Sequence, residues 1–208
     1  DVAGFVPTDF WDEARKQLDQ VKPVFLLAEW EDPELHTNAF DMTYVWELHH
    51  IMNEVAKGEK SAQDIRDYFT KQDTTFRKED YRLYFTSNHD ENSWNGATKA
   101  RMGDAHEALA VLSFIVPGMP LIYSGQEAGL DKRLSFFGKD SIDWSNLEMT
   151  PFYQKLIDLK HNNPALWNGK HGGFLAWYGD LPNGVIGCLR PDKDNNMDQK
   201  CDCCSAHQ

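Results

Sequence analysis

Residues 83–92 read LYFTSNHDEN, a short apolar run that ends in a group of polar and charged side chains. Such a run is typical of a strand in a parallel sheet, because both faces of that strand are buried. The carboxylate of Asp90 would then emerge just beyond the end of the strand. A carboxylate in this place is costly to bury unless it is paired or used. We therefore expect Asp90 to have either a structural partner or a chemical task.

Two further carboxylates stand at similar places. Glu29 closes the apolar run at residues 24–28 (VFLLA), and Asp1 precedes the residues VAGFVP. Glu29 lies 28 residues after Asp1, and Asp90 lies 61 residues after Glu29. One strand and one helix of an eight-stranded barrel take about 30 residues. The spacing thus corresponds to one unit and then two, and it predicts that all three acids emerge at one face of a barrel.

The remaining pattern alternates between helices and strands, which predicts an α/β fold with a parallel sheet. Thr8, Ser61 and Thr150 are expected to cap helices, and Asp64 follows three residues after Ser61. Four strands and the tip of a fifth at Asp1 make about half of an eight-stranded barrel. We expect helices over residues 8–22, 45–56, 61–70, 104–116 and 150–161, and strands over residues 24–28, 39–44, 83–86 and 119–123.

The character of the chain changes after residue 165. Residues 172–179 and 184–189 resemble antiparallel strands joined by a turn at residues 182–184. We therefore expect three parts: half a barrel over residues 1–165, the start of a truncated β-sandwich-like domain over residues 166–190, and a tail. The tail, residues 191–208, is polar without apolar periodicity and is expected to be poorly ordered.

Composition excludes some classes of function. The 208 residues are 41% hydrophobic, which is typical of a globular chain, and the net charge is −12. A nucleic acid is not an expected partner, because phosphate binding needs a basic surface. No run of 18 apolar residues exists, so we expect no membrane span. The cysteines at 188, 201, 203 and 204 do not decide the localisation, which stays open.

Two patterns suggest metal ligands only weakly. His49 and His50 follow Glu47, but adjacent helical residues point in different directions, so we interpret them as surface residues. Residues 201–204 contain a single CxxC pair, and one pair without a second cluster is a weak zinc motif. No metal site is predicted from either pattern.

The three acids suggest glycoside hydrolysis, in which two carboxylates flank the scissile bond. In the retaining version one acid is the nucleophile, and the other donates a proton and later accepts one. Glu29 suits proton donation, because the apolar run before it and Trp30 after it would limit hydration of its charged form. For each acid alone, a helix cap or salt bridge would be the simpler interpretation.

Four segments together resemble the α-amylase family (glycoside hydrolase family 13). Residues 85–90 (FTSNHD) resemble its strand-seven motif, and residues 25–29 (FLLAE) resemble its strand-five motif. Residues 1–4 (DVAG) resemble the latter part of its strand-four motif, and residues 118–127 (GMPLIYSGQE) resemble its strand-eight segment. The resemblance covers roughly residues 1–180. It implies a partial TIM (β/α)8 barrel, from the end of strand four through helix eight.

The resemblance also implies roles for individual residues. Asp1 matches the nucleophile, Glu29 the general acid/base, and Asp90 the third acid, which holds sugar hydroxyls and stabilises the transition state. His89 matches a histidine that hydrogen-bonds the same sugar, and Asn88 belongs to the same substrate-binding block. The implied substrate is an α-glucan such as starch or a maltooligosaccharide.

Trp30 and Trp94 stand beside these motifs and are candidate walls for sugar rings, with ordinary packing as the alternative. Asn92 and Arg101 lie close in sequence but are not assigned to the substrate. The visible residues require no cofactor. The resemblance allows calcium in the full-length family member, with ligands mostly outside this chain.

The chain also departs from the family pattern. The arginine two residues before the nucleophile and the first three strands are absent, and the chain starts at Asp1 without Met. We therefore expect a fragment that is unstable and inactive alone. The sequence does not predict its oligomeric state. Two alternatives stay open: a transglycosylase of the same family, which uses the same three acids, and a non-catalytic carbohydrate-binding remnant.

Overall fold

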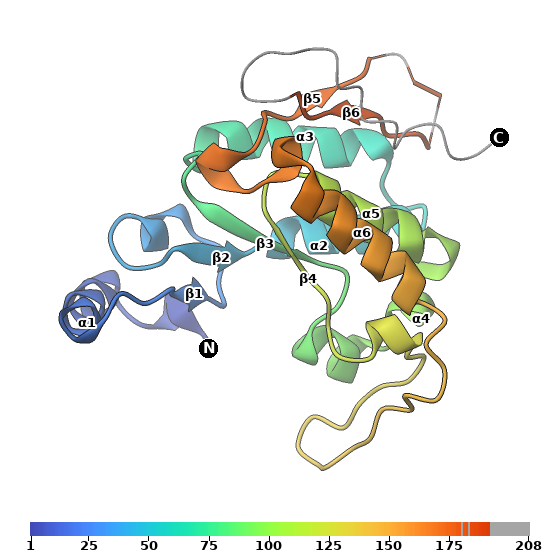
Figure 1. Cartoon of the computed structure of the whole chain (residues 1–208), viewed down its shortest axis with the longest axis horizontal. Helices are drawn as coiled ribbons and strands as arrows, with labels where there is room; N and C mark the ends of the chain where they lie inside the picture. Colours follow the sequence, from blue (N-terminus) through green and yellow to red (C-terminus); the bar gives the residue numbers. More distant parts are fainter. Residues whose placement is uncertain (180, 183, 192–208) are drawn as a thin grey trace.

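The computed structural model describes residues 1–179, 181–182 and 184–191. Its centre is a four-stranded parallel sheet with the strand order β1-β2-β3-β4 (Figure 1). Because all three strand pairs are parallel, the carboxyl ends of the four strands lie at the same end of the sheet. The strands are β1 (Leu27–Ala28), β2 (Met42–Tyr44), β3 (Tyr81–Phe85) and β4 (Met119–Leu121).

Helices connect the strands and confirm the predicted alternation (Figure 1). The helix α1 precedes β1, the pair α2 and α3 joins β2 to β3, the pair α4 and α5 joins β3 to β4, and α6 follows β4. The bounds of the helices are α1 (Thr8–Val21), α2 (Trp46–Ala56), α3 (Ala62–Thr75), α4 (Thr98–Met102), α5 (His106–Ile115) and α6 (Thr150–Asn162). Short helical turns lie at η1 (Ala3–Phe5), η2 (Pro33–His36), η3 (Glu91–Asn95), η4 (Gly103–Ala105), η5 (Gln126–Ala128), η6 (Pro164–Leu166) and η7 (Gly169–His171).

The core lies on both faces of β3, because successive side chains of a strand point to opposite faces. Leu83 and Phe85 pack with Met42 and Tyr44 of the neighbouring strand. Tyr84 points the other way and joins the core between the sheet and the helices, which includes Leu48, Met52, Ile65, Phe69, Leu112 and Val116. The sequence run at residues 83–86 is therefore a buried strand, as predicted.

The prediction for residues 24–28 is wrong in extent and in burial. Only Leu27 and Ala28 form a strand, and Leu27 is 39% exposed while Ala28 is fully buried. Phe25 is 54% exposed. The physical reason is position: among the described residues, β1 pairs with β2 alone and leaves its other edge open.

Of the three predicted helix caps, one is correct and two are wrong. The Ser61 hydroxyl accepts a hydrogen bond from the backbone N–H of Gln63 at 3.2 Å, and Asp64 accepts one from the N–H of Ser61 at 2.8 Å. This capping box confirms the prediction. Thr8 and Thr150 are instead the first residues of their helices, and Pro7 and Met149 occupy the cap positions.

Beyond α6, the strands β5 (Ala176–Trp177) and β6 (Cys188–Leu189) pair in antiparallel orientation, as predicted but over fewer residues. The ring of Trp177 packs against Phe69 of α3 at 5.4 Å. The division into a half barrel, a β domain and a tail stays a prediction. The tail from residue 192 and the CxxC pair at residues 201–204 lie outside the described residues. Within the described part of the chain, no helix combines the length and apolar character that a membrane crossing requires.

Candidate active site

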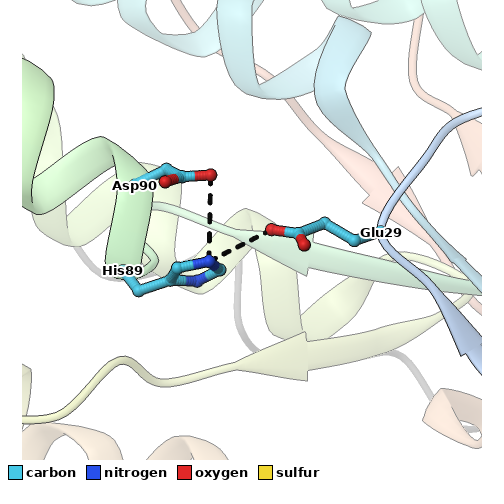
Figure 2. A group of neighbouring side chains, drawn as sticks. All are labelled: Glu29, His89 and Asp90. Carbon is cyan, nitrogen blue, oxygen red and sulfur yellow. Dashed lines mark ion pairs between the residues drawn. The ribbon is translucent and has the colours of Figure 1, made fainter. Parts of the chain in front are cut away.

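Three side chains from two strands meet at the carboxyl edge of the sheet (Figure 2). Glu29 directly follows β1, and His89 and Asp90 follow β3. The Nε2 atom of His89 lies 3.2 Å from Oε1 of Glu29 and 3.8 Å from Oδ2 of Asp90. The imidazole therefore lies between two carboxylates that are distant in the sequence. Glu29 and Asp90 are neighbours, as their spacing predicts.

The Glu29 carboxylate is largely shielded from water. Its side chain is 15% exposed, and its Oε1 atom is buried without a hydrogen bond from any described residue. His89 Nε2 is close to this oxygen but does not complete a hydrogen bond to it. A buried oxygen without a hydrogen bond is costly. This oxygen is therefore placed to accept a proton, or a hydrogen bond from a hydroxyl group of a ligand.

Asp1 lies beside this group, but its carboxylate is not part of it. The side chain of Asp1 is 89% exposed, whereas its amino group lies 4.0 Å from Oε2 of Glu29. Val2 has a φ of 45°, which is rare for a β-branched residue. The structure thus brings residue 1 to the margin of the site without joining the Asp1 carboxylate to those of Glu29 and Asp90.

Tyr44 is a residue of this site that the sequence analysis did not identify. It ends β2, the strand between those that lead to Glu29 and to Asp90. Burial, and then the negative charges of Glu29 and Asp90, raise the pKa of the Tyr44 phenol. Its position at the end of the expected strand at residues 39–44 was the available indication, because parallel strands all end at the same edge.

The segment that carries His89 and Asp90 is fixed by its buried neighbours. The Asn88 side chain accepts a hydrogen bond from the backbone N–H of Glu91 at 2.7 Å. Its amide nitrogen is buried and has no partner among the described residues. The chain then forms one π-helical turn, η3, a rare geometry that is frequent at functional sites. The proposed contact of Asn88 with substrate stays a prediction.

Glu91 forms a buried hydrogen bond with His49 behind the site, and this corrects the interpretation of His49. The Nε2 atom of His49 lies 2.9 Å from Oε2 of Glu91, and Nδ1 lies 3.2 Å from the carbonyl oxygen of Phe85. His49 is fully buried, so it is not a surface residue, whereas His50 is exposed as predicted. Burial alone would raise the pKa of Glu91, but the hydrogen bond and charge of His49, together with Arg101, lower it.

The other residues considered from the sequence have structural partners. Arg101 is buried and donates hydrogen bonds to Asn53 Oδ1 at 2.7 Å and to the Thr86 carbonyl at 2.6 Å. The ring of Trp30 is half-buried, and its centre lies 5.0 Å from that of the Phe5 ring. The Trp30 ring also packs so closely on Gly4 that a side chain at residue 4 would clash with it. Trp94 is 52% exposed and stays available for a ligand. The Asn92 side chain binds the loop after β4, as described below.

The same three side chains could hold a cation. One ligand atom from each of Glu29, His89 and Asp90 lies within 4.8 Å of the other two. Two carboxylates and one imidazole offer oxygen and nitrogen donors that suit several divalent ions. Nothing in this geometry selects an ion over proton transfer, and the prediction that no metal is required stays a prediction.

Comparison with known proteins identifies the family of the chain. Residues 6–181 match the family model described as the catalytic domain of alpha-amylase. The chain belongs to the alpha-amylase family. The chain is 30% identical in sequence to an alpha-amylase of Lactobacillus plantarum. The crystal structure of that enzyme aligns with 90% of the chain at a TM-score of 0.75. A maltogenic alpha-amylase of Thermotoga neapolitana is 27% identical over 90% of the chain, with a TM-score of 0.78.

The protein studied is shorter than these relatives. It covers 47% and 44% of those two crystal structures. Alpha-amylase MalA of Haloarcula japonica is 27% identical over 171 residues, which are 80% of this chain and 25% of the relative. The resemblance predicted from the motifs is thus confirmed at the level of family and of an α/β fold with a parallel sheet.

Proposed function

We propose that the protein is a retaining hydrolase of α-glucans such as starch and maltooligosaccharides. One observation carries the proposal. In this chain of the α-amylase family, a buried oxygen of Glu29 that has no hydrogen bond lies 3.2 Å from His89, and His89 also neighbours Asp90. A shielded carboxyl group next to a second acid and an imidazole is suited to proton transfer at a glycosidic oxygen.

The proposed reaction has two steps. Glu29 protonates the leaving oxygen of the glycosidic bond while the Asp1 carboxylate attacks the anomeric carbon and forms a covalent glycosyl-enzyme. Glu29 then takes a proton from water, which attacks the same carbon and releases Asp1. Asp90 and His89 hold the hydroxyls of the reacting sugar, and the negative charge of Asp90 stabilises the oxocarbenium-like transition state.

Asp1 is the component that needs a change of position. Its carboxylate must turn toward Glu29, whereas here the amino group of residue 1 lies 4.0 Å from Oε2 of Glu29. The proximity of the backbone of residue 1 supports the assignment. No step of the proposed reaction uses a metal ion or a cofactor, and calcium would be a structural addition in the full-length protein.

We also propose that residues 1–165 form the C-terminal half of a (β/α)8 barrel and that residues 166–190 begin a β domain. Support comes from the open edge of β1, the parallel strand order, the pairing of β5 with β6, and the twofold greater length of the crystallised relatives. On this proposal, residues beyond this chain complete the activity, so activity is tested on the full-length protein.

The test measures release of reducing sugar from soluble starch by the full-length protein and its Glu29→Gln variant. General acid/base catalysis contributes about 10²- to 10⁴-fold, so we expect at least about a 100-fold loss. Glu34→Gln is the matched control, since Glu34 is an exposed glutamate five residues later. The first product should carry the α configuration by NMR, as retention requires.

Three outcomes contradict the proposal. Equal activity of wild type and Glu29→Gln would remove the role of Glu29. Release of the β anomer would exclude retention. Products longer than the substrate, formed from maltotriose, would identify a transglycosylase in place of a hydrolase.

A further inference from the structure

Three exposed aromatic rings form a continuous surface on the loop after β4 and on η3. We call Trp94, Phe136 and Phe137 the aromatic platform. Phe137 is 89% exposed, Trp94 52% and Phe136 43%. The ring centres lie 5.0 Å apart for Trp94 and Phe136, and 4.8 Å apart for Phe136 and Phe137. Contiguous exposed apolar surface of this kind is typical of a binding site.

The platform is held by hydrogen bonds rather than by apolar packing. The Asn92 side chain donates to the carbonyl of Lys132 at 3.0 Å and accepts from the N–H of Leu134 at 2.8 Å. Arg133 donates to the carbonyls of Ser93, at 3.2 Å, and of Trp94. The two segments that carry the rings are therefore fixed to each other, and the rings are positioned before any ligand binds.

The loop is also braced internally. Asp140 accepts hydrogen bonds from Lys132 Nζ at 2.8 Å and from the backbone N–H of Ser135 at 3.0 Å. These contacts close the loop directly around Phe136 and Phe137. The exposure of the two rings is thus a consequence of a defined loop shape.

The platform is continuous with the candidate active site. The Phe136 ring lies 6.4 Å from the His89 ring, and the planes of the two rings differ by only 24°. His89 in turn lies 3.2 Å from Glu29. A chain of sugar units with one unit at His89 would extend its next units over these rings, because the apolar C–H faces of pyranose rings suit aromatic surfaces.

We propose that Phe136, Phe137 and Trp94 bind the α-glucan units next to the unit held at His89, so that the protein prefers long chains over short ones. This inference rests on the proposed function and adds a determinant of chain length to it. The occupant is a glucan rather than a protein, because the rings extend directly from the residues assigned to the sugar.

The test compares Phe137→Ala with wild type on maltotriose and on soluble starch, using the full-length protein. Phe137 is almost fully exposed, so its removal should not disturb the fold. We expect the KM for starch to rise about three- to tenfold with kcat unchanged, and the KM for maltotriose to stay the same. Phe137→Tyr should restore the wild-type KM, because it restores the ring. Phe174→Ala, 55% exposed and at the opposite end of β3 and β4, is the control.

A binding measurement separates this inference from the proposed function. Calorimetric titration of Glu29→Gln with maltoheptaose needs no hydrolysis. We expect Phe137→Ala in that background to bind about three- to tenfold more weakly. Equal affinity, or no binding of maltoheptaose to Glu29→Gln, overturns the platform even if starch is hydrolysed. Absence of hydrolysis with weakened binding in Phe137→Ala overturns only the hydrolase.

Discussion

Replacing His49 by alanine should destabilise the protein strongly although His49 lies outside the group of Glu29, His89 and Asp90. His49 is fully buried and pairs with Glu91, whose side chain is 11% exposed. Its ring also stacks on Phe85 at 4.6 Å. The alanine variant leaves the Glu91 carboxylate buried without its hydrogen bond from His49 and opens a cavity beside Phe85.

The magnitude follows from these contacts. Removing the hydrogen-bond partner of a buried charged group costs about 1.5–3 kcal/mol. Arg101, 3.8 Å from Glu91, remains and offsets part of this cost, while the lost packing on Phe85 adds to it. We therefore expect a loss of about 3 kcal/mol in the free energy of unfolding. In the full-length protein, where the shift per kcal/mol is smaller than in a chain of about 200 residues, that lowers Tm by a few degrees.

Thermal unfolding followed by circular dichroism, on wild type, His49→Ala and His50→Ala, measures this effect. His50 is exposed, so its substitution should change the free energy of unfolding by less than about 0.5 kcal/mol. The folded state lowers the pKa of Glu91, so the stability from this pair is present above the unfolded pKa and is lost as pH falls. The difference between wild type and His49→Ala should therefore shrink in acid. Equal Tm values for His49→Ala and His50→Ala at neutral pH would refute the reasoning.

Two further predictions concern stability. Burial lowers the pKa of Lys160 to about 7, so from about pH 7 to 10 the unfolded chain binds a proton that the folded chain does not. The free energy of unfolding should rise with pH in this window by up to about 1.4 kcal/mol per unit, and Lys160→Met should remove this rise in urea titrations. Ser61→Ala removes the cap of α3 and should lower the free energy of unfolding by about 1 kcal/mol; an unchanged midpoint in urea would show that Asp64 alone sustains the helix start.

Local patterns in the sequence were sufficient where the determining contacts were local. The capping box at Ser61 and the buried strand that precedes Asn88-His89-Asp90 depend on residues within a few positions of each other. Periodicity could not reveal that β1 pairs with β2 alone among the described residues, because the number of neighbouring strands is not encoded in the run itself. Two threonine caps were misplaced by one residue, an ordinary uncertainty for helix ends.

The candidate site shows the same division. The spacing of the acids correctly predicts that Glu29 and Asp90 meet, because it counts strand-helix units. The spacing of adjacent helical residues correctly separates His49 from His50, but it cannot say that His49 faces Glu91, which is 42 residues away. Of the aromatic platform, the sequence indicated Trp94 alone. Phe136 and Phe137 were not predicted, because their loop has no periodicity and its shape depends on Asn92 across the site.

The residues that surround His89 and Asp90 explain how exposed groups keep a defined position. His89 is 49% exposed and Asp90 36%, so packing of their own side chains cannot fix them. Asn88, Glu91 and Asn92 are buried on either side. They bind the η3 turn, His49 and the loop after β4, respectively. Because one five-residue segment joins all three anchors, a change at His49 or Asn92 should move both the candidate acid Asp90 and the aromatic platform without either residue contacting the sugar.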